Sequence, residues 1–348
     1  MSSARPRIHV VAAVLARADG RVLIAQRPAG KPMAGAWEFP GGKLDPGEER
    51  FAGLARELDE ELGVQVEAAR PLIRYVHSYP ERDVDLDTWR VTRWHGEPRG
   101  LEGQALDWRA PDTLAARDTL GAGDTLATMG LLPADAAIVS ALRLPSLLSV
   151  TPPAAPDGEA AFLDALETAA GSAPLICLRR PDLEPAALLE LAAGAACRIE
   201  DTGARLLLHG EPAALAPLLL EPPAALRARL GDAIAGLHVP ARSLAGLSAR
   251  PVPASLWFGA SCHDAAELEA ARSAGADYAF LGPVQPTASH PGAPGIGWPA
   301  FTAAVEPLAM PVYAIGGLGP QDLDEAWQGG AQGVAAIRGL WPGRPADS

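Results

Sequence analysis

Residues 42–64 read GKLDPGEERFAGLARELDEELGV, and this stretch decides how the N-terminal part of the chain is interpreted. Glu57, Glu60 and Glu61 are spaced i, i+3 and i+4, so a helix over residues 51–62 places three carboxylates on one face. Like charges this close repel one another unless a cation neutralises them, and carboxylate oxygens suit Mg2+ or Mn2+. The stretch therefore predicts a helix that carries a divalent metal site. The alternative is a solvated acidic helix face.

The same stretch resembles a known motif. It matches the Nudix box, G-x5-E-x7-R-E-U-x-E-E-x-G-U with U an aliphatic residue, at every fixed position from Gly42 to Val64. Two further segments, PMAGAWEFPGGK at 32–43 and RWHGEPRGLEGQ at 93–104, resemble the MutT-type 8-oxo-dGTP diphosphatases of that family. The likeness covers residues 7–143 and implies an α/β/α sandwich built on a mixed sheet.

The resemblance also implies a reaction and a set of site residues. The reaction hydrolyses a nucleoside triphosphate to the monophosphate and pyrophosphate. In this family it removes oxidised nucleotides from the nucleotide pool before DNA replication uses them, a function grouped with DNA repair. The implied metal ligands, for Mg2+ or Mn2+, are the Gly41 carbonyl, Glu57, Glu60, Glu61 and Glu102. The implied catalytic residues are Glu57 as general base, Arg56 as its orienter, and Glu48. The implied substrate contacts are Lys43, Arg27, Glu38, Phe39 and Asp135. For Glu102 the alternative is an ordinary loop carboxylate.

Base recognition departs from the subfamily pattern. The subfamily reads the oxidised purine with an asparagine early in the last helix, but this chain contains no asparagine and has Asp135 at that place. An ionised carboxylate only accepts hydrogen bonds, so Asp135 donates to a purine O6 only when it is protonated. Otherwise it accepts from a ring N–H or an exocyclic amine. The alternative is that Asp135 is a helix N-cap. The expected substrate is 8-oxo-dGTP, and the alternatives are another nucleotide or a thiamine-pathway diphosphate.

The rhythm of the chain changes at about residue 146. Before it, strands are expected at His9–Ala16, Arg21–Gln26, Leu72–His77 and Trp89–Trp94, and a second helix at Ala134–Leu142. After it, short apolar strands alternate with Ala/Leu-rich helices, at Leu147–Val150, Leu175–Leu178, Arg205–Leu208, Gly236–Val239, Leu256–Gly259, Tyr278–Leu281, Val312–Ile315 and Gly333–Ile337. Eight such strands predict a (β/α)8 barrel. The expected organisation is an α/β chain with a Nudix domain over residues 1–145 and a TIM barrel over residues 146–348.

Four segments of the second half resemble the thiamine phosphate synthase and thiazole tautomerase family. They are GASCH at 259–263, GADYAFLGPVQPT at 275–287, PVYAIGG at 311–317 and GAQGVAAI at 330–337. The resemblance implies a site for a phosphate-bearing ligand, with Arg179, Thr287, Gly316 and Gly317 as contacts and His263 as a proton-transfer residue. For His263 the alternative is a hydrogen-bonded residue at a strand end.

The catalytic parts of the synthase pattern are eroded. The family's two metal-binding aspartates are replaced within LHGE at 208–211 and LHVPARS at 237–243. The only lysines of the chain are Lys31 and Lys43, so neither lysine of the family pattern is present in the barrel. The barrel is therefore expected to bind a phosphate-bearing ligand, to sense one, to act as a tautomerase, or to be inert, rather than to make thiamine phosphate.

Composition limits the remaining classes. The 348 residues carry 29 Lys+Arg against 42 Asp+Glu, a net charge of −13, which argues against non-specific binding to duplex DNA. No run approaches the roughly 18 apolar residues of a membrane span. Cys177, Cys197 and Cys262 are too few for a disulfide framework and are expected to be small core residues in a reducing compartment. The sequence indicates a cytoplasmic protein and gives no oligomeric state.

Overall fold

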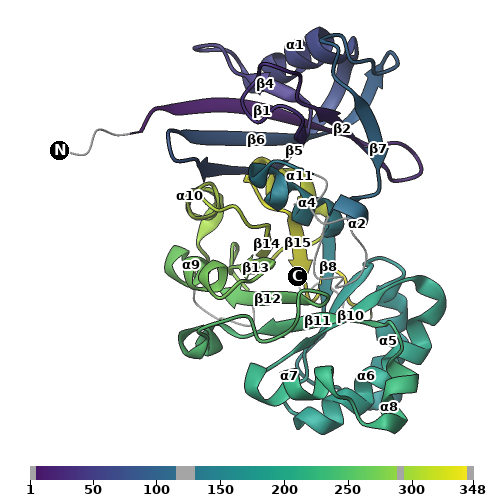
Figure 1. The fold of residues 1–348 in the computed structure, drawn as a ribbon. Helices are drawn as coiled ribbons and strands as arrows, with labels where there is room; N and C mark the ends of the chain where they lie inside the picture. Colours follow the sequence, from purple (N-terminus) through teal and green to yellow (C-terminus); the bar gives the residue numbers. More distant parts are fainter. Residues whose placement is uncertain (1–4, 115–129, 288–293, 343–348) are drawn as a thin grey trace. The chain divides into compact units, whose positions relative to one another are not determined.

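The computed structural model describes residues 5–114, 130–287 and 294–342 (Figure 1). The chain divides into two units, residues 1–144 together with 305–309, and residues 145–304 together with 310–348.

The N-terminal unit contains seven strands and two long helices among its described residues. The strands are β1 (Arg7–Leu15), β2 (Val22–Gln26), β3 (Trp37–Glu38), β4 (Gly41–Lys43), β5 (Gln65–Ser78), β6 (Asp83–His95) and β7 (Leu106–Arg109). The helices are α1 (Arg50–Leu62), the short α2 (Pro111–Leu114), the 3-10 turn η1 (Pro133–Asp135) and α4 (Ala136–Arg143). The helix predicted from the acidic motif is confirmed, and Gly63 ends it in the left-handed conformation, with φ of 66°.

The strands form two sheets. The larger has the order β4-β1-β6-β5 and is mixed, since β1 runs parallel to β6 while the other pairs are antiparallel. The smaller has the order β3-β2-β7 and is antiparallel. β3, β4 and β7 were not among the strands expected from the sequence.

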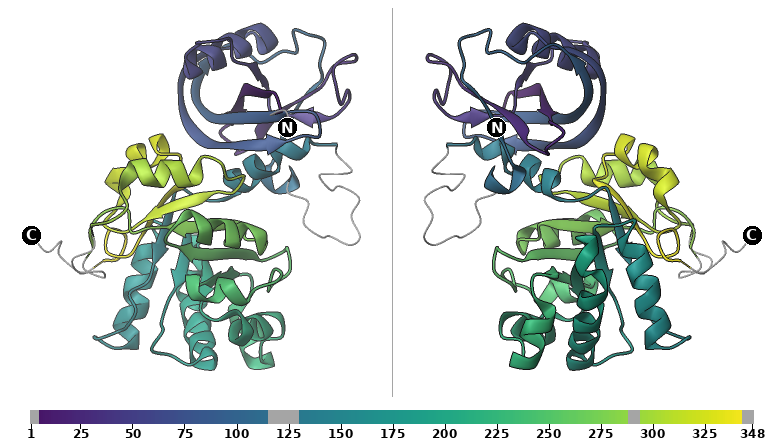
Figure 2. Two further views of the ribbon diagram at one scale, coloured as in Figure 1. Left: turned by 90° about the vertical axis from the view of Figure 1, so that its left-hand side faces the viewer. Right: turned by 90° about the vertical axis from the view of Figure 1, so that its right-hand side faces the viewer.

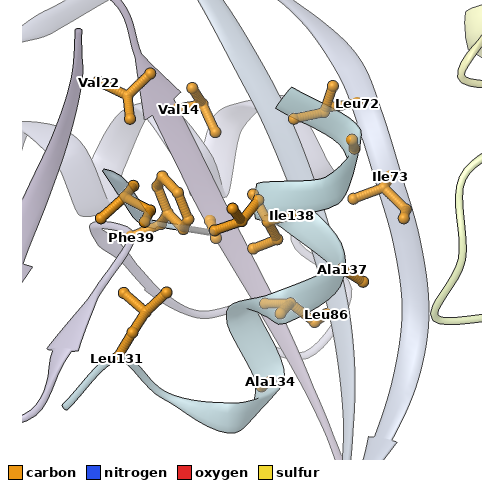
Figure 3. Close-up of a cluster of buried hydrophobic side chains, with 14 of the residues drawn as sticks. Val14, Val22, Phe39, Leu72, Ile73, Leu86, Leu131, Ala134, Ala137 and Ile138 are labelled. Carbon is orange, nitrogen blue, oxygen red and sulfur yellow. The ribbon is translucent and has the colours of Figure 1, made fainter. Parts of the chain in front are cut away.

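Strand β1 shows why helices cover both faces of the larger sheet. Successive side chains of a strand point to opposite faces. Val11, Ala13 and Leu15 lie on the face that packs against Leu54 and Leu58 of α1. Val14 lies on the other face and packs with Ile138 of α4. Figure 3 shows the second of these clusters, with Ile138 between the sheet and Phe39. The predicted sandwich on a mixed sheet is confirmed.

The C-terminal unit is a closed barrel. Its eight strands, all parallel to their neighbours, are β8 (Leu147–Val150), β9 (Leu175–Leu178), β10 (Arg205–His209), β11 (Ile234–Val239), β12 (Trp257–Cys262), β13 (Tyr278–Leu281), β14 (Val312–Ile315) and β15 (Gly333–Ala336). The eight-stranded barrel is confirmed, and four of the predicted strands have the observed bounds. Figure 2 shows its helices outside the ring of strands.

The connections between the barrel strands are uneven. The helices are α5 (Glu159–Ala170), α6 (Pro185–Ile199), α7 (Pro212–Leu220), α8 (Ala224–Leu230), α9 (Ala265–Ser273), α10 (Gly297–Val305) and α11 (Leu323–Gln328), with 3-10 turns η2 (Glu200–Thr202), η3 (Ala241–Gly246) and η4 (Pro320–Asp322). Two helices join β10 to β11, and only η3 lies between β11 and β12.

Cysteine placement corrects one expectation. Cys177 and Cys262 are buried as expected, but Cys197 is exposed. It lies on α6, whose buried face is formed by leucine, alanine and isoleucine side chains. Among the described residues, no helix is both long enough and apolar enough to cross a membrane.

Candidate active site

Helix α1 turns its acidic residues outward because its opposite face is buried. Leu54, Leu58 and Leu62 are fully buried in the core between α1 and the larger sheet. Glu57 and Glu61 of the same helix remain partly accessible. The carboxylates that the sequence predicts on one face of this helix therefore lie on the face that the fold leaves uncovered.

Arg56 holds three of the carboxylates. Its guanidinium donates to both oxygens of Glu48, at 2.9 Å each, and to Oε1 of Glu57 at 2.9 Å. It also donates to Oε2 of Glu60 at 3.3 Å and to the Lys43 carbonyl at 3.1 Å. The paired hydrogen bonds from Arg56 hold the pKa of Glu48 at about 2, so Glu48 is ionised at neutral pH. The structure brings together the three residues expected to be catalytic.

Two glycines of β4 allow close approach, Gly42 to α1 and Gly41 to β1. A Cβ on Gly42 would lie 2.0 Å from Oε2 of Glu57, and a Cβ on Gly41 would lie 2.1 Å from the Val11 carbonyl oxygen. Gly41 also has φ of +149° and donates its N–H to Oε2 of Glu61 at 3.2 Å. The motif requires glycine at residue 42 because Glu57 occupies the space next to the backbone, and the close approach of β1 requires glycine at residue 41.

Glu61 and Glu102 lie in an acidic neighbourhood. Burial raises the pKa of Glu61 to about 7; the Gly41 N–H and the Lys31 ammonium oppose that rise, and the charge of Glu102 adds to it. Lys31 Nζ donates to Oε2 of Glu102 at 2.6 Å. Gln104 accepts the Glu102 N–H at 2.8 Å and donates to the Glu61 carbonyl at 3.0 Å. Sequence reasoning assigned no role to Lys31 or Gln104.

Four of the five expected substrate contacts meet in a second group. Asp135 is buried, with 4% of its surface exposed, and accepts the Phe39 N–H at 3.3 Å. Burial, and then the charge of Glu38, raise the pKa of Asp135 well above its usual range. Glu38 itself is paired with Arg27. The Asp135 side chain makes no capping hydrogen bond to α4, so it does not act as a side-chain N-cap. Lys43, the fifth expected contact, lies outside this group and is exposed on β4.

The residues expected to bind a ligand in the barrel are spread over several strand ends. Arg179 follows β9 and is partly buried; among the described residues its guanidinium has no hydrogen-bonding or ionic partner. His263 follows β12, is exposed, and bonds Glu267 at 2.9 Å through Nδ1. Thr287 ends the described segment after β13. Gly316 and Gly317 follow β14 with φ of +100° and +74°.

Comparison with known proteins gives two matches that follow one another along the chain. A NUDIX domain model matches residues 11–123, and a thiamine monophosphate synthase model matches residues 147–340. The chain belongs to both families. Its N-terminal part is a Nudix hydrolase, and its C-terminal part is a barrel of the thiamine monophosphate synthase family.

Individual relatives agree with this division. A CTP pyrophosphohydrolase of Escherichia coli is 42% identical over 105 residues, covering 30% of this chain and 77% of the relative. An 8-oxo-dGTP diphosphatase of Proteus vulgaris is 40% identical over 93 residues, covering 27% of this chain and 83% of the relative. A putative thiamine-phosphate synthase of Geobacter sulfurreducens is 31% identical over 174 residues, covering 49% of this chain and 75% of the relative.

Nudix hydrolases generally use a divalent metal, and the residues of this site fit one in chemistry. Within residues 5–114, 130–287 and 294–342, no three acidic, histidine or cysteine side chains lie close enough to share a metal ion. The carboxylates are paired with protein cations, Glu48 and Glu57 with Arg56 and Glu102 with Lys31. Glu61 nevertheless has the character of a ligand, since it is a largely buried carboxylate beside another acidic residue. A cation that prefers oxygen ligands would neutralise the negative charge of such a carboxylate and its acidic neighbour.

Proposed function

We propose that the Nudix part of this chain is a Mg2+-dependent pyrophosphohydrolase that converts a nucleoside triphosphate and water to the monophosphate and pyrophosphate. The observation that carries the proposal is the hydrogen bonding of Arg56 to Glu57 and Glu60 on the uncovered face of α1 and to Glu48, which precedes that helix. Manganese would serve in place of magnesium, because both prefer oxygen ligands.

The residues that would hold the metal are Glu57, Glu60, Glu61, Glu102 and the Gly41 carbonyl. When bound, the cation would neutralise phosphate charge and favour deprotonation of a water molecule. Arg56 keeps the Glu57 carboxylate in one position, which suits Glu57 to act as a general base. The exposed ammonium of Lys43 is available to a phosphate oxygen.

The preferred substrate in this proposal is 8-oxo-dGTP, and the role is sanitation of the nucleotide pool. Asp135 and the Phe39 backbone would line the base site. A protonated Asp135 both donates and accepts, as an asparagine amide does, and its burial favours that protonated form. The second candidate is CTP, because the E. coli relative at 42% identity is named a CTP pyrophosphohydrolase.

A kinetic panel tests this proposal. The full-length protein is assayed with Mg2+ against 8-oxo-dGTP, dGTP, CTP and dCTP, and kcat/KM is compared. The proposal expects 8-oxo-dGTP to be the best substrate. A preference for cytidine nucleotides would replace it with the second candidate, and hydrolysis of none of the four would remove the assignment.

For the barrel we propose binding of a small phosphate-bearing ligand rather than synthesis of thiamine phosphate. Glu211, which follows β10, already accepts from Arg242 at 2.8 Å and from the Ser243 hydroxyl at 2.6 Å. Its carboxylate is thus engaged by protein donors, whereas Arg179 retains an unpaired guanidinium among the described residues. A thermal-shift titration of the full-length protein with thiazole phosphate tests ligand binding, and an unchanged melting curve would contradict it.

A further inference from the structure

The only two lysines of the chain both lie beside the candidate active site. Among 29 Lys and Arg residues, the lysines are Lys31, in the loop between β2 and β3, and Lys43, exposed on β4. A lysine ammonium is a compact charge on a flexible stem, whereas the planar guanidinium of arginine suits fixed paired hydrogen bonds. The two cations with the greatest freedom of movement are therefore found next to the acidic face of α1.

Lys31 lies among three carboxylates. Its Nζ donates to Oε2 of Glu102 at 2.6 Å, and the charges of Glu61 and Glu38 also act on it. The hydrogen bond to Glu102, which outweighs the opposing effect of burial, raises the pKa of Lys31, so the side chain is a cation at neutral pH. Glu61 and Glu102 are two of the proposed metal ligands. The ammonium therefore supplies positive charge to carboxylates that are proposed to hold a divalent ion.

The loop of Glu102 is fixed, so the movable partner of this ion pair is Lys31. The Leu101 N–H and the side-chain amide of Gln104 both donate to the Glu61 carbonyl, at 3.0 Å each. Gln104 also accepts the Glu102 N–H at 2.8 Å. These bonds hold the Glu102 backbone against the end of α1, whereas the Lys31 side chain is 44% exposed on a flexible stem. Opening of the pair would therefore move the ammonium rather than the carboxylate.

The loop that carries Lys31 is anchored to the group of expected substrate contacts. Arg27, which pairs with Glu38, donates from Nε to the Pro32 carbonyl at 2.8 Å. The Arg27 carbonyl accepts the Gly35 N–H at 3.0 Å. Lys31 is thus tied through its loop to the expected base site and through its ammonium to the acidic face. The phosphates of a nucleotide that occupies both would pass this ammonium.

We propose that Lys31 is an exchangeable counter-ion, which pairs with Glu102 when no divalent ion is bound and transfers to a phosphate oxygen of the triphosphate when a divalent ion takes Glu102. The inference rests on the proposed pyrophosphohydrolase function and deepens it, because it adds a residue that couples metal binding to substrate binding. The exchange breaks one ion pair and forms another. The ammonium keeps its protons throughout, so Lys31 binds substrate and transfers no proton.

The exchange has two consequences of opposite sign. A divalent ion that binds alone displaces the ammonium from Glu102, so removal of the ammonium should tighten metal binding. A triphosphate that binds together with the ion gains an ion pair with Lys31, so the same removal should weaken triphosphate binding. A Lys31 that only tied its loop to the Glu102 loop would behave differently. Its loss would release the Glu102 side chain and weaken metal binding.

Titration with Mn2+ alone tests the first consequence. The full-length wild type and Lys31→Gln are titrated, and the free ion is measured by electron paramagnetic resonance. We expect Lys31→Gln to bind Mn2+ about 5-fold more tightly, the upper range for loss of an exposed ion pair. The control is Arg21→Gln, which removes the same charge and breaks a pair of the same length, Arg21–Asp19 at 2.6 Å, in the turn before β2. This control should bind Mn2+ as the wild type does, and unchanged or weaker binding by Lys31→Gln would overturn the proposal.

Titration with a triphosphate that is not hydrolysed tests the second consequence. The α,β-methylene analogues of dGTP and of CTP are titrated by calorimetry at saturating Mn2+, so that base preference does not decide the result. We expect Lys31→Gln to weaken binding of the better analogue by about 10-fold, the effect of losing one hydrogen bond between charged groups. Arg21→Gln should bind it as the wild type does. Equal affinity of Lys31→Gln and the wild type would overturn the transfer to phosphate.

The outcomes separate this inference from the function on which it rests. If Lys31→Gln behaves as the wild type in both titrations while the wild type hydrolyses a nucleotide of the kinetic panel, the exchange is wrong and the pyrophosphohydrolase proposal stands. If the wild type binds neither Mn2+ nor an analogue and hydrolyses none of the panel, both are wrong.

Discussion

Replacing Asp135 by asparagine tests how the base site is built. Asp135 is 4% exposed, and the one hydrogen bond to its carboxylate among the described residues comes from the Phe39 N–H at 3.3 Å. Folding raises the pKa of the Asp135 carboxyl. The protonated carboxyl therefore adds to the free energy of unfolding, and this contribution is complete at pH values below the pKa that Asp135 has in the unfolded chain. That contribution is lost as the pH rises through the folded pKa. Asparagine has nearly the same shape and does not ionise, so the variant should not show this loss.

Two magnitudes follow for Asp135→Asn. A buried charge without a partner costs about 3–5 kcal/mol, which is the upper limit for the stability that the variant gains over the wild type at alkaline pH. A lost hydrogen-bond donor is worth about 1–3 kcal/mol, or about 10- to 100-fold in selectivity. The wild-type preference for 8-oxo-dGTP over dGTP should therefore fall as pH rises, whereas that of the variant should stay constant.

The assay measures kcat/KM for both nucleotides, in wild type and variant, across a pH series. Taking the ratio at each pH cancels the ionisation of substrate phosphates and metal ligands, which both nucleotides share. Chemical denaturation at the same pH values gives the stability arm. Parallel selectivity profiles for the two proteins would show that Asp135 does not read the base. Parallel stability profiles would show that it is not a buried titrating acid.

Three other perturbations address the metal face and the barrel. Glu57→Gln and Glu61→Gln should each reduce kcat by at least about 100-fold. The metal-free variants should be as stable as the wild type or more stable, because a charge is removed from the acidic face. A near-normal kcat at saturating Mg2+ would remove these residues from the mechanism. Gly42→Ala places a Cβ 2.0 Å from the Glu57 carboxylate, so it should displace that carboxylate and lower kcat by about 100-fold. The control is Gly246→Ala, whose Cβ meets open space and should leave kcat unchanged. Equal activity of both variants would contradict this. The full-length chain should make no thiamine phosphate from the pyrimidine diphosphate and thiazole phosphate, and product above a no-enzyme control would refute this.

The parts predictable from sequence are those with strong local signals. The helix of the acidic motif has a buried leucine face and a glycine end, so its pattern and its structure agree. The barrel strands are short apolar runs between helices, a pattern that local spacing reveals. β3 and β4 have two and three residues, too few for any periodicity, and they form through pairing with β2 and β1.

The parts that could not be predicted depend on contacts between distant residues. Asp135 has the sequence context of an N-cap, yet its carboxylate turns inward to Phe39, 96 positions earlier, and only the fold determines that burial. His238 is fully buried in β11, and the inward face of that strand cannot be chosen until the barrel closes. The Lys31–Glu102 pair joins two loops 71 positions apart, and no spacing rule relates them.

The most direct test of the account is product analysis of a single reaction. The full-length protein is incubated with 8-oxo-dGTP and Mg2+, and the products are separated by ion-exchange chromatography, with Glu57→Gln as the matched control. We expect 8-oxo-dGMP and pyrophosphate in equal amounts from the wild type and almost none from the variant. Release of inorganic phosphate and the nucleoside diphosphate, or equal turnover by the variant, would contradict pyrophosphohydrolysis at the α1 site.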